Sequence, residues 1–300
     1  MSSLAFLGSP AVSAACLDAL VQAGHDITWV VSGRDKRRGR GGATSPTPVK
    51  EAALALGLPV SDRVEDALSS GAELGVVVAF GRIIRPEALA LLPMVNLHFS
   101  LLPRWRGAAP VERAILAGDE RTGVCLMKVE AGLDEGGVYA RRETAIGPEE
   151  TAEELTTRLG VLGTELLLEV LAGGVASLPE PAPQEGEVSY AAKLTAAELH
   201  LDFARPAREL HRLVRVGRAW TTFRGGRLLV HRAAVDASPA TAPPGEVVEG
   251  RVATAAGWLL PLEVQPEGRS RQSFDDFARG ARLLSGERLG GAEPTSGTVA

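Results

Sequence analysis

Residues 96–110 read NLHFSLLPRWRGAAP and follow an apolar segment, which predicts a strand that runs out of the hydrophobic core into a polar loop. Side chains alternate between the two faces of a strand, so Asn96 and His98 share one face while Leu97 and Phe99 share the other. Open α/β sheets bind ligands at the carboxyl ends of their strands. An isolated Asn-x-His pair would more simply cap a strand, but the residues that flank this pair favour a functional site.

The segments before this stretch predict a parallel sheet. An apolar run at residues 4–7, a helical pattern over 12–23 and a second apolar run at 27–31 form a βαβ unit, which implies parallel strands. Residues 74–80, LGVVVAF, are apolar without interruption, as in a parallel strand that is covered on both faces. The turn at residues 8–10 reads GSP and lacks the G-x-G-x-x-G fingerprint, which argues against a dinucleotide oxidoreductase.

The chain divides at a segment rich in Pro and Glu. Residues 178–187 have the composition of a linker, and short strand patterns separated by turns begin near residue 220, which predicts a small β-barrel. We therefore expect an N-terminal α/β domain over residues 1–177, a linker over 178–204, a C-terminal β domain over 205–289 and a flexible tail over 290–300.

The composition is that of a water-soluble globular protein. The 300 residues are 45% hydrophobic and 23% charged, and the net charge of -5 argues against a generally basic nucleic-acid binder. Cys16 and Cys125 lie in apolar segments, which favours buried thiols over a disulfide. The chain shows no signal peptide and no apolar stretch that would span a membrane. We expect a monomer in the reducing cytoplasm, without a membrane partner.

Positive charge is concentrated in two segments, although the protein is acidic overall. The Gly-rich loop within residues 32–48 has few apolar residues, and its cations are Arg34, Lys36, Arg37, Arg38 and Arg40. A helix over residues 206–216 would place Arg208, Arg212 and Arg215 on one face by their spacing. Local basic patches on an acidic protein favour a phosphate-bearing partner, but two solvated arginine-rich surfaces would give the same pattern.

Beyond these patterns, the sequence resembles a known family. NLHFSLLPRWRGAAP followed by GLDEG at residues 132–136 resembles the formyltetrahydrofolate-dependent formyltransferases, in which an Asn-x-His is followed by a later Asp. The ending of the first motif is most similar to the methionyl-tRNA formyltransferase branch. Further segments that resemble this branch are GSP at 8–10, SPTPVK at 45–50, VVVAFG at 76–81, SYAAKL at 189–194 and QPEGRSRQSFDDFARG at 265–280.

This resemblance implies both a fold and a function. It implies a Rossmann-like N-terminal domain with a C-terminal domain similar to an OB-fold barrel. It also implies that the formyl group of 10-formyltetrahydrofolate passes to the amino group of initiator methionyl-tRNA, giving N-formylmethionyl-tRNA for translation initiation. The segment implied to contact the folate comprises Ser100, Leu101, Leu102 and Pro103. The basic loop would reach the acceptor stem of the tRNA, and the arginine face of the helix is expected to contact its phosphates.

Formyl transfer to an amine explains why these residue types are needed. Negative charge develops on the formyl oxygen, and the attacking amine must lose a proton, so a site requires oxyanion donors and a proton acceptor. We expect Asn96 and His98 to stabilise the oxyanion and the leaving group. Asp134 would hold His98 in its charged form and assist removal of the proton. No metal is required, and the other histidines lack the spacing of metal ligands.

Two other readings compete with this one. A formyltransferase that acts on an amino sugar or on glycinamide ribonucleotide would use the same centre, but a small acceptor needs neither the basic loop nor the additional C-terminal domain. An RNA-binding protein on a degenerate Rossmann scaffold would not need Asn96, His98 and Asp134 together. The sequence therefore favours an enzyme that acts on tRNA.

Overall fold

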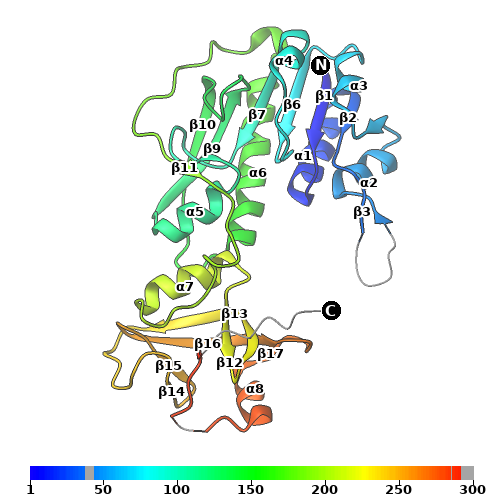
Figure 1. The fold of residues 1–300 in the computed structure, drawn as a ribbon. Coiled ribbons are helices and arrows are strands. Elements are labelled where there is room, and N and C mark those ends of the chain that lie inside the picture. The colour runs from blue at the N-terminus through cyan, green and yellow to red at the C-terminus, as the bar shows by residue number, and fades with distance from the viewer. Residues whose placement is uncertain (38–43, 285, 292–300) are drawn as a thin grey trace. The chain divides into compact units, whose positions relative to one another are not determined.

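The computed structural model describes residues 1–37, 44–284 and 286–291 (Figure 1). The chain forms two compact units. The first unit comprises Met1–Arg113, Glu120–Ile146 and Glu154–Ala192. The second comprises Ala114–Asp119, Gly147–Glu153 and the residues from Lys193 onward. In the described part of the chain, no helix combines the length and the apolarity needed to cross a lipid bilayer.

A seven-stranded sheet forms the centre of the first unit, with strand order β10-β9-β7-β6-β1-β2-β5. The five strands from β7 to β5 are parallel, and β9 and β10 are antiparallel additions at the other edge. The bounds are β1 (Ser3–Gly8), β2 (Asp26–Val31), β5 (Val60–Ser61), β6 (Leu74–Val78), β7 (Met94–His98), β9 (Arg121–Lys128) and β10 (Val138–Ala145). The prediction of a mostly parallel, Rossmann-like sheet is confirmed.

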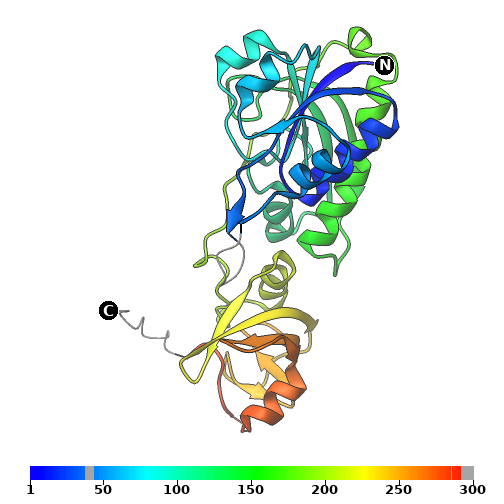
Figure 2. The same cartoon turned by 90° about the vertical axis from the view of Figure 1, so that its right-hand side faces the viewer.

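Helices cover both faces of this sheet (Figure 2). On one face lie α1 (Ala11–Gln22), α2 (Pro48–Ala55) and α6 (Ala152–Leu171), and on the other lie α3 (Val64–Leu68) and α4 (Pro86–Leu91). The long helix α6 turns Leu155, Leu159 and Leu167 into the core, where each is fully buried. A strand that is covered on both faces must be apolar throughout, which is why every residue of β6 is buried.

The strand β7 presents different side chains to the two helical layers. A Cβ placed on Gly163 of α6 would lie 3.5 Å from the side chain of Leu97, so Leu97 points toward α6. Met94 belongs to the apolar cluster that also contains Ala67 of α3, on the opposite face. Because side chains alternate along a strand, Asn96 and His98 share the face of Met94.

The segment predicted as a linker begins with ordered contacts in the first unit. After the turn η1 (Val175–Ser177), Ala182 forms an antiparallel bridge with Val138. Further on, β11 (Tyr190–Ala191) pairs in parallel with β8 (Arg106–Gly107). We call residues 181–191 the strap, because they connect the start of β10 to the loop that follows β7.

The second unit is built on a six-stranded antiparallel sheet. Its strands are β12 (Trp220–Phe223), β13 (Gly226–Asp236), β14 (Val247–Val248), β15 (Arg251–Ala253), β16 (Trp258–Pro266) and β17 (Gln272–Ser273). Helices α7 (Ala207–Val216) and α8 (Phe274–Ala281) pack apolar side chains against the sheet, including Leu210 and Phe277. The prediction of a C-terminal β domain is confirmed, and its sheet is antiparallel.

Three short elements complete the described part of the chain. The two-residue strands β3 (Lys36–Arg37) and β4 (Thr44–Ser45) form an antiparallel pair. Helix α5 (Pro110–Ala117) follows β8 and begins with the proline that the sequence placed in its first turn. Cys16 and Cys125 are both free thiols and both buried, as predicted, and burial raises the pKa of the Cys16 thiol to about 11.

Candidate active site

His98 ends β7 and is almost fully buried, with 5% of its surface exposed. Its Nε2 atom lies 2.9 Å from the carbonyl oxygen of Trp105. A carbonyl only accepts hydrogen bonds, so Nε2 must carry a proton and donate it. Nδ1 faces the carboxylate of Asp134, 3.6 Å from Oδ2. The structure therefore orients the ring with one nitrogen committed to the backbone and the other directed at an acid.

Asp134 reaches His98 from a loop that is separated from it in sequence. Its Oδ2 atom accepts a hydrogen bond of 2.7 Å from the backbone N–H of Gly107. Its backbone has a φ of 50°, a left-handed conformation that is uncommon for residues other than glycine. A Cβ on Gly136 would lie 1.9 Å from the carbonyl oxygen of Lys128, so only glycine permits the loop to pass this close to β9.

Asn96 is half-buried and lies on the same face of β7 as His98. Two residues along a strand span roughly 6–7 Å, so a small group could contact both side chains. Among the described residues, the amide of Asn96 has no hydrogen-bond partner, and its donors are available to a ligand. The structure thus brings His98 and Asp134 together and places Asn96 beside them.

The segment that the resemblance assigned to the folate is mostly buried. Ser100 is 1% exposed, and its hydroxyl donates a hydrogen bond of 2.6 Å to the carbonyl oxygen of Arg104. Leu102 packs with Cys125, Met127 and Val138, and Pro103 is also buried. Leu101 alone of the four is half-buried. These side chains pack within the first unit and shape the loop after β7.

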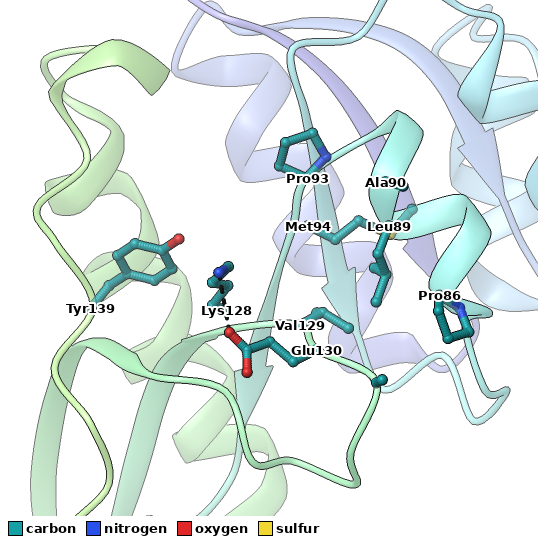
Figure 3. Close-up of a pocket in the computed structure, with 10 residues that line it drawn as sticks. Pro86, Leu89, Ala90, Pro93, Met94, Lys128, Val129, Glu130 and Tyr139 are labelled. Carbon is teal, nitrogen blue, oxygen red and sulfur yellow. Dashed lines mark ion pairs between the residues drawn. The ribbon is translucent and has the colours of Figure 1, made fainter.

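A cavity of about 370 Å³ lies between α4, the start of β7 and the beginning of the Asp134 loop (Figure 3). Its apolar wall comprises Pro86, Leu89, Ala90, Pro93, Met94, Val129 and Ala131. Lys128, Glu130 and Tyr139 supply the polar side, where Lys128 and Glu130 form an ion pair of 3.1 Å. The hydrogen bond to Glu130 raises the pKa of Lys128, and burial raises the pKa of Tyr139. Sequence analysis did not identify this cavity.

The strap also supplies residues that sequence analysis missed. Gln184 contacts the backbone of the Asp134 loop, and the Ser189 hydroxyl accepts a hydrogen bond of 3.0 Å from the Trp105 N–H. A composition rich in Pro and Glu suggested a linker, and nothing in this sequence pattern distinguished Gln184 as a residue with a specific contact. Within the described ranges, no cluster of three or more metal-ligating side chains is arranged to hold an ion.

The predicted cations of the basic loop are described only in part. Arg34 is exposed and pairs with Asp62 at 2.7 Å, and this pair lowers the pKa of the Asp62 carboxyl. The backbone of Lys36 and Arg37 forms β3, whereas Arg38 and Arg40 lie outside the described residues. Of this group, Arg34 is thus the cation whose side chain is seen at the surface.

The three arginines predicted on one face of α7 have different surroundings within the second unit. Arg208 is exposed. Arg212 lies against Gly118, where a Cβ would come within 2.1 Å of its guanidinium. Arg215 donates hydrogen bonds of 2.8 Å to the carbonyl oxygens of Glu150 and Gly147, and its partial burial lowers its pKa. Arg212 and Arg215 therefore have structural contacts that Arg208 lacks.

Comparisons with known proteins show the family to which the chain belongs. A family model described as formyl transferase matches residues 2–171, and a second, described as formyl transferase, C-terminal domain, matches residues 193–282. The methionyl-tRNA formyltransferase of Symbiobacterium thermophilum is 44% identical over 314 residues, which cover 96% of this chain and 95% of that protein. The methionyl-tRNA formyltransferase of Thermus thermophilus is 45% identical over 308 residues, which cover 96% and 99%.

Solved structures share the fold at low sequence identity. An N-formyltransferase from Helicobacter canadensis, in complex with folinic acid and dTDP-3-aminofucose, matches with a TM-score of 0.69 and 17% identity over 89% of this chain and 100% of that chain. Methionyl-tRNA formyltransferase from Clostridium thermocellum matches with a TM-score of 0.56 and 17% identity over 79% and 95%. At this identity the likeness supports the fold alone.

The contrast between Arg215 and Arg208 predicts different effects on stability. Arg215→Ala should destabilise the second unit by about 1–3 kcal/mol, because two carbonyls lose a charged donor. Arg208→Ala should change stability by less than about 0.5 kcal/mol, since an exposed side chain is removed. Native-state hydrogen exchange of amides in α7 and β13 measures both changes. Equal losses in the two variants would contradict the assigned roles.

Proposed function

This chain belongs to the formyl transferase family, and we propose that it transfers a formyl group from 10-formyltetrahydrofolate to the amino group of initiator methionyl-tRNA. The similarity to methionyl-tRNA formyltransferases over 96% of the chain supports the acceptor. The observation that carries the chemistry is the buried His98 directed at Asp134, with the amide of Asn96 on the same strand face. The product would be N-formylmethionyl-tRNA, made in the cytoplasm for translation initiation.

The reaction forms a bond between the amine nitrogen and the formyl carbon and breaks the bond from that carbon to N10 of the folate. Between these steps the formyl oxygen carries negative charge. The free amide of Asn96 is positioned to donate to this oxygen. Nε2 of His98 is already bonded to the Trp105 carbonyl at 2.9 Å, so only an N–H at Nδ1 remains to donate toward the oxygen or the leaving nitrogen.

The two carboxylate oxygens of Asp134 have different surroundings. Oδ2 accepts from Gly107 N–H and faces His98, while Oδ1 has no partner among the described residues. A carboxylate held this way stabilises a charged imidazole and still offers a lone pair to the attacking amine or to an intervening water. Asp134 is thus proposed both to hold His98 in its charged form and to assist removal of the proton.

The cavity beside the Asp134 loop is the proposed seat of the flat ring of the folate. Its volume of about 370 Å³ and its apolar wall suit an aromatic ring system. Met94 lines it and lies two residues before Asn96 on the same strand face, so a ring bound there would extend toward Asn96 and His98. Residues 100–103 would shape the neighbouring backbone, in keeping with their burial.

The tRNA contacts are proposed at two basic segments. Arg34 and Arg208 are exposed, so phosphates can reach them, and Lys36, Arg37, Arg38 and Arg40 extend the first segment by sequence. Arg215 already donates to two backbone carbonyls of the second unit, and the guanidinium of Arg212 lies against Gly118, so we assign both a supporting role in presenting α7.

Replacement of the three central residues should abolish most of the activity. Asn96→Ala should lower kcat about 10²–10³-fold through loss of an oxyanion donor. His98→Ala and Asp134→Asn should lower kcat/KM by about 10²–10⁴-fold. Formylation of methionyl-tRNA by 10-formyltetrahydrofolate measures these rates, with the melting temperature as a control for folding. Near-native kcat/KM in a folded His98 or Asp134 variant would refute the assignment.

Removal of the exposed Arg208 should weaken tRNA binding without affecting the chemistry. For Arg208→Gln we expect a higher KM for methionyl-tRNA and a slope of log KM against log salt that is smaller by about 1. The rate with methionine methyl ester, which has no phosphates, should stay unchanged. An unchanged salt slope would exclude a phosphate contact at Arg208. Formylation of a dTDP-linked amino sugar in preference to methionyl-tRNA would instead reassign the acceptor.

A further inference from the structure

The loop that carries Asp134 contains no regular secondary structure between Glu130 and Gly137. Asp134 itself is in the left-handed region, with a φ of 50°. A residue in that conformation requires contacts that hold it there. The Gly107 N–H fixes one carboxylate oxygen, but the backbone of the loop must also be held if the carboxylate is to keep its position opposite His98.

Gln184 in the strap holds this backbone. Its Nε2 group donates hydrogen bonds of 2.7 Å to the carbonyl oxygen of Asp134 and 2.9 Å to that of Gly136. Its Oε1 atom accepts hydrogen bonds of 3.1 Å and 2.8 Å from Nε and Nη2 of Arg106. An amide has two donor hydrogens and two acceptor lone pairs, and all four are used. A flipped amide would set donors against donors and acceptors against acceptors, so its orientation is fixed.

Arg106 closes a ring of contacts around the carboxylate. It is 9% exposed, its backbone N–H donates to the carbonyl oxygen of Ser189 at 2.9 Å, and Nη1 lies 3.4 Å from Glu135. The next residue is Gly107, whose N–H binds the Asp134 carboxylate. The ring therefore runs from the Asp134 side chain through Gly107 and Arg106 to Gln184, and returns to the Asp134 backbone.

From this ring we propose that Gln184 is a positioning residue for catalysis, which fixes the Asp134 carboxylate against His98 through the loop backbone. The inference rests on the proposed function of Asp134. Gln184 acts through another residue, so its loss should reduce kcat while leaving KM for donor and acceptor nearly unchanged. A misplacement of about 1 Å costs up to about 100-fold in rate, so a loop that relaxes by this amount would lose most of its activity.

Gln184→Glu tests the donated hydrogen bonds with little change of shape. The introduced carboxylate would keep the contact with Arg106 and turn it into an ion pair. Its second oxygen, however, would face the two carbonyl oxygens of Asp134 and Gly136, which need donors. We expect kcat to fall at least about tenfold and KM to change less than about twofold. The melting temperature should fall while the protein stays folded at the assay temperature, because two carbonyl oxygens lose their donors. Gln184→Met, which loses both sets of contacts, should behave in the same way. Glu185→Gln, at an exposed neighbour in the strap, is the matched control and should leave all three quantities unchanged.

A second measurement does not depend on turnover. The Gly107 amide should exchange its hydrogen at least about tenfold faster in Gln184→Glu, because its acceptor on Asp134 is no longer held in place. A native kcat with native exchange at Gly107 would overturn the inference, as would a rise of KM in proportion to the loss of kcat. If the wild-type chain does not formylate methionyl-tRNA, the proposed function fails, and the exchange rate at Gly107 still decides the role of Gln184.

Discussion

The hydrogen bond from His98 Nε2 to the carbonyl oxygen of Trp105 is the constraint on which the rest of the site depends. It fixes the proton on Nε2 and turns Nδ1 toward Asp134. It also prevents rotation of the imidazole ring, which belongs to a residue that is only 5% exposed. The backbone of Trp105 is in the left-handed region, with a φ of 63°, and the hydrogen bond of 3.0 Å from its N–H to the Ser189 hydroxyl helps to hold it there. The reactive face of His98 is therefore set by the loop after β7 and by the strap, and not by the strand alone.

The topology of the sheet explains why the cavity and the acid lie on the same face. Strand β9 runs antiparallel to β7, so Lys128 at its end pairs with Val95 near the start of β7, far from His98. The following loop must fold back across the sheet to bring Asp134 to His98, and it leaves the cavity beneath its first residues, beside Met94. Close passage at Gly136 and the contacts of Gln184 hold the returning loop in place.

The sequence predicted the parts of the molecule that repeat a simple period. Alternation placed Asn96 and His98 on one face, and the apolar run of β6 and the βαβ unit indicated the parallel sheet. Contacts between distant backbone segments carry no such signal. The two-residue pairing of β8 with β11 and the four bonds of Gln184 could not be read from a Pro-rich composition. Charge alone likewise could not separate Arg208, which is exposed, from Arg215, which binds two carbonyls of its own unit.

The most direct test of this account is the protonation of the two ring nitrogens of His98, measured by ¹⁵N NMR of the imidazole with His98→Gln to assign the signal. The geometry predicts a proton on Nε2 in the folded protein, because the Trp105 carbonyl can only accept a hydrogen bond. When Asp134 is replaced by Asn, the ¹⁵N chemical shift of the second nitrogen, Nδ1, should change, while that of Nε2 should not. An unprotonated Nε2 in the folded protein, with the proton on Nδ1 alone, would contradict the arrangement from which the mechanism is built.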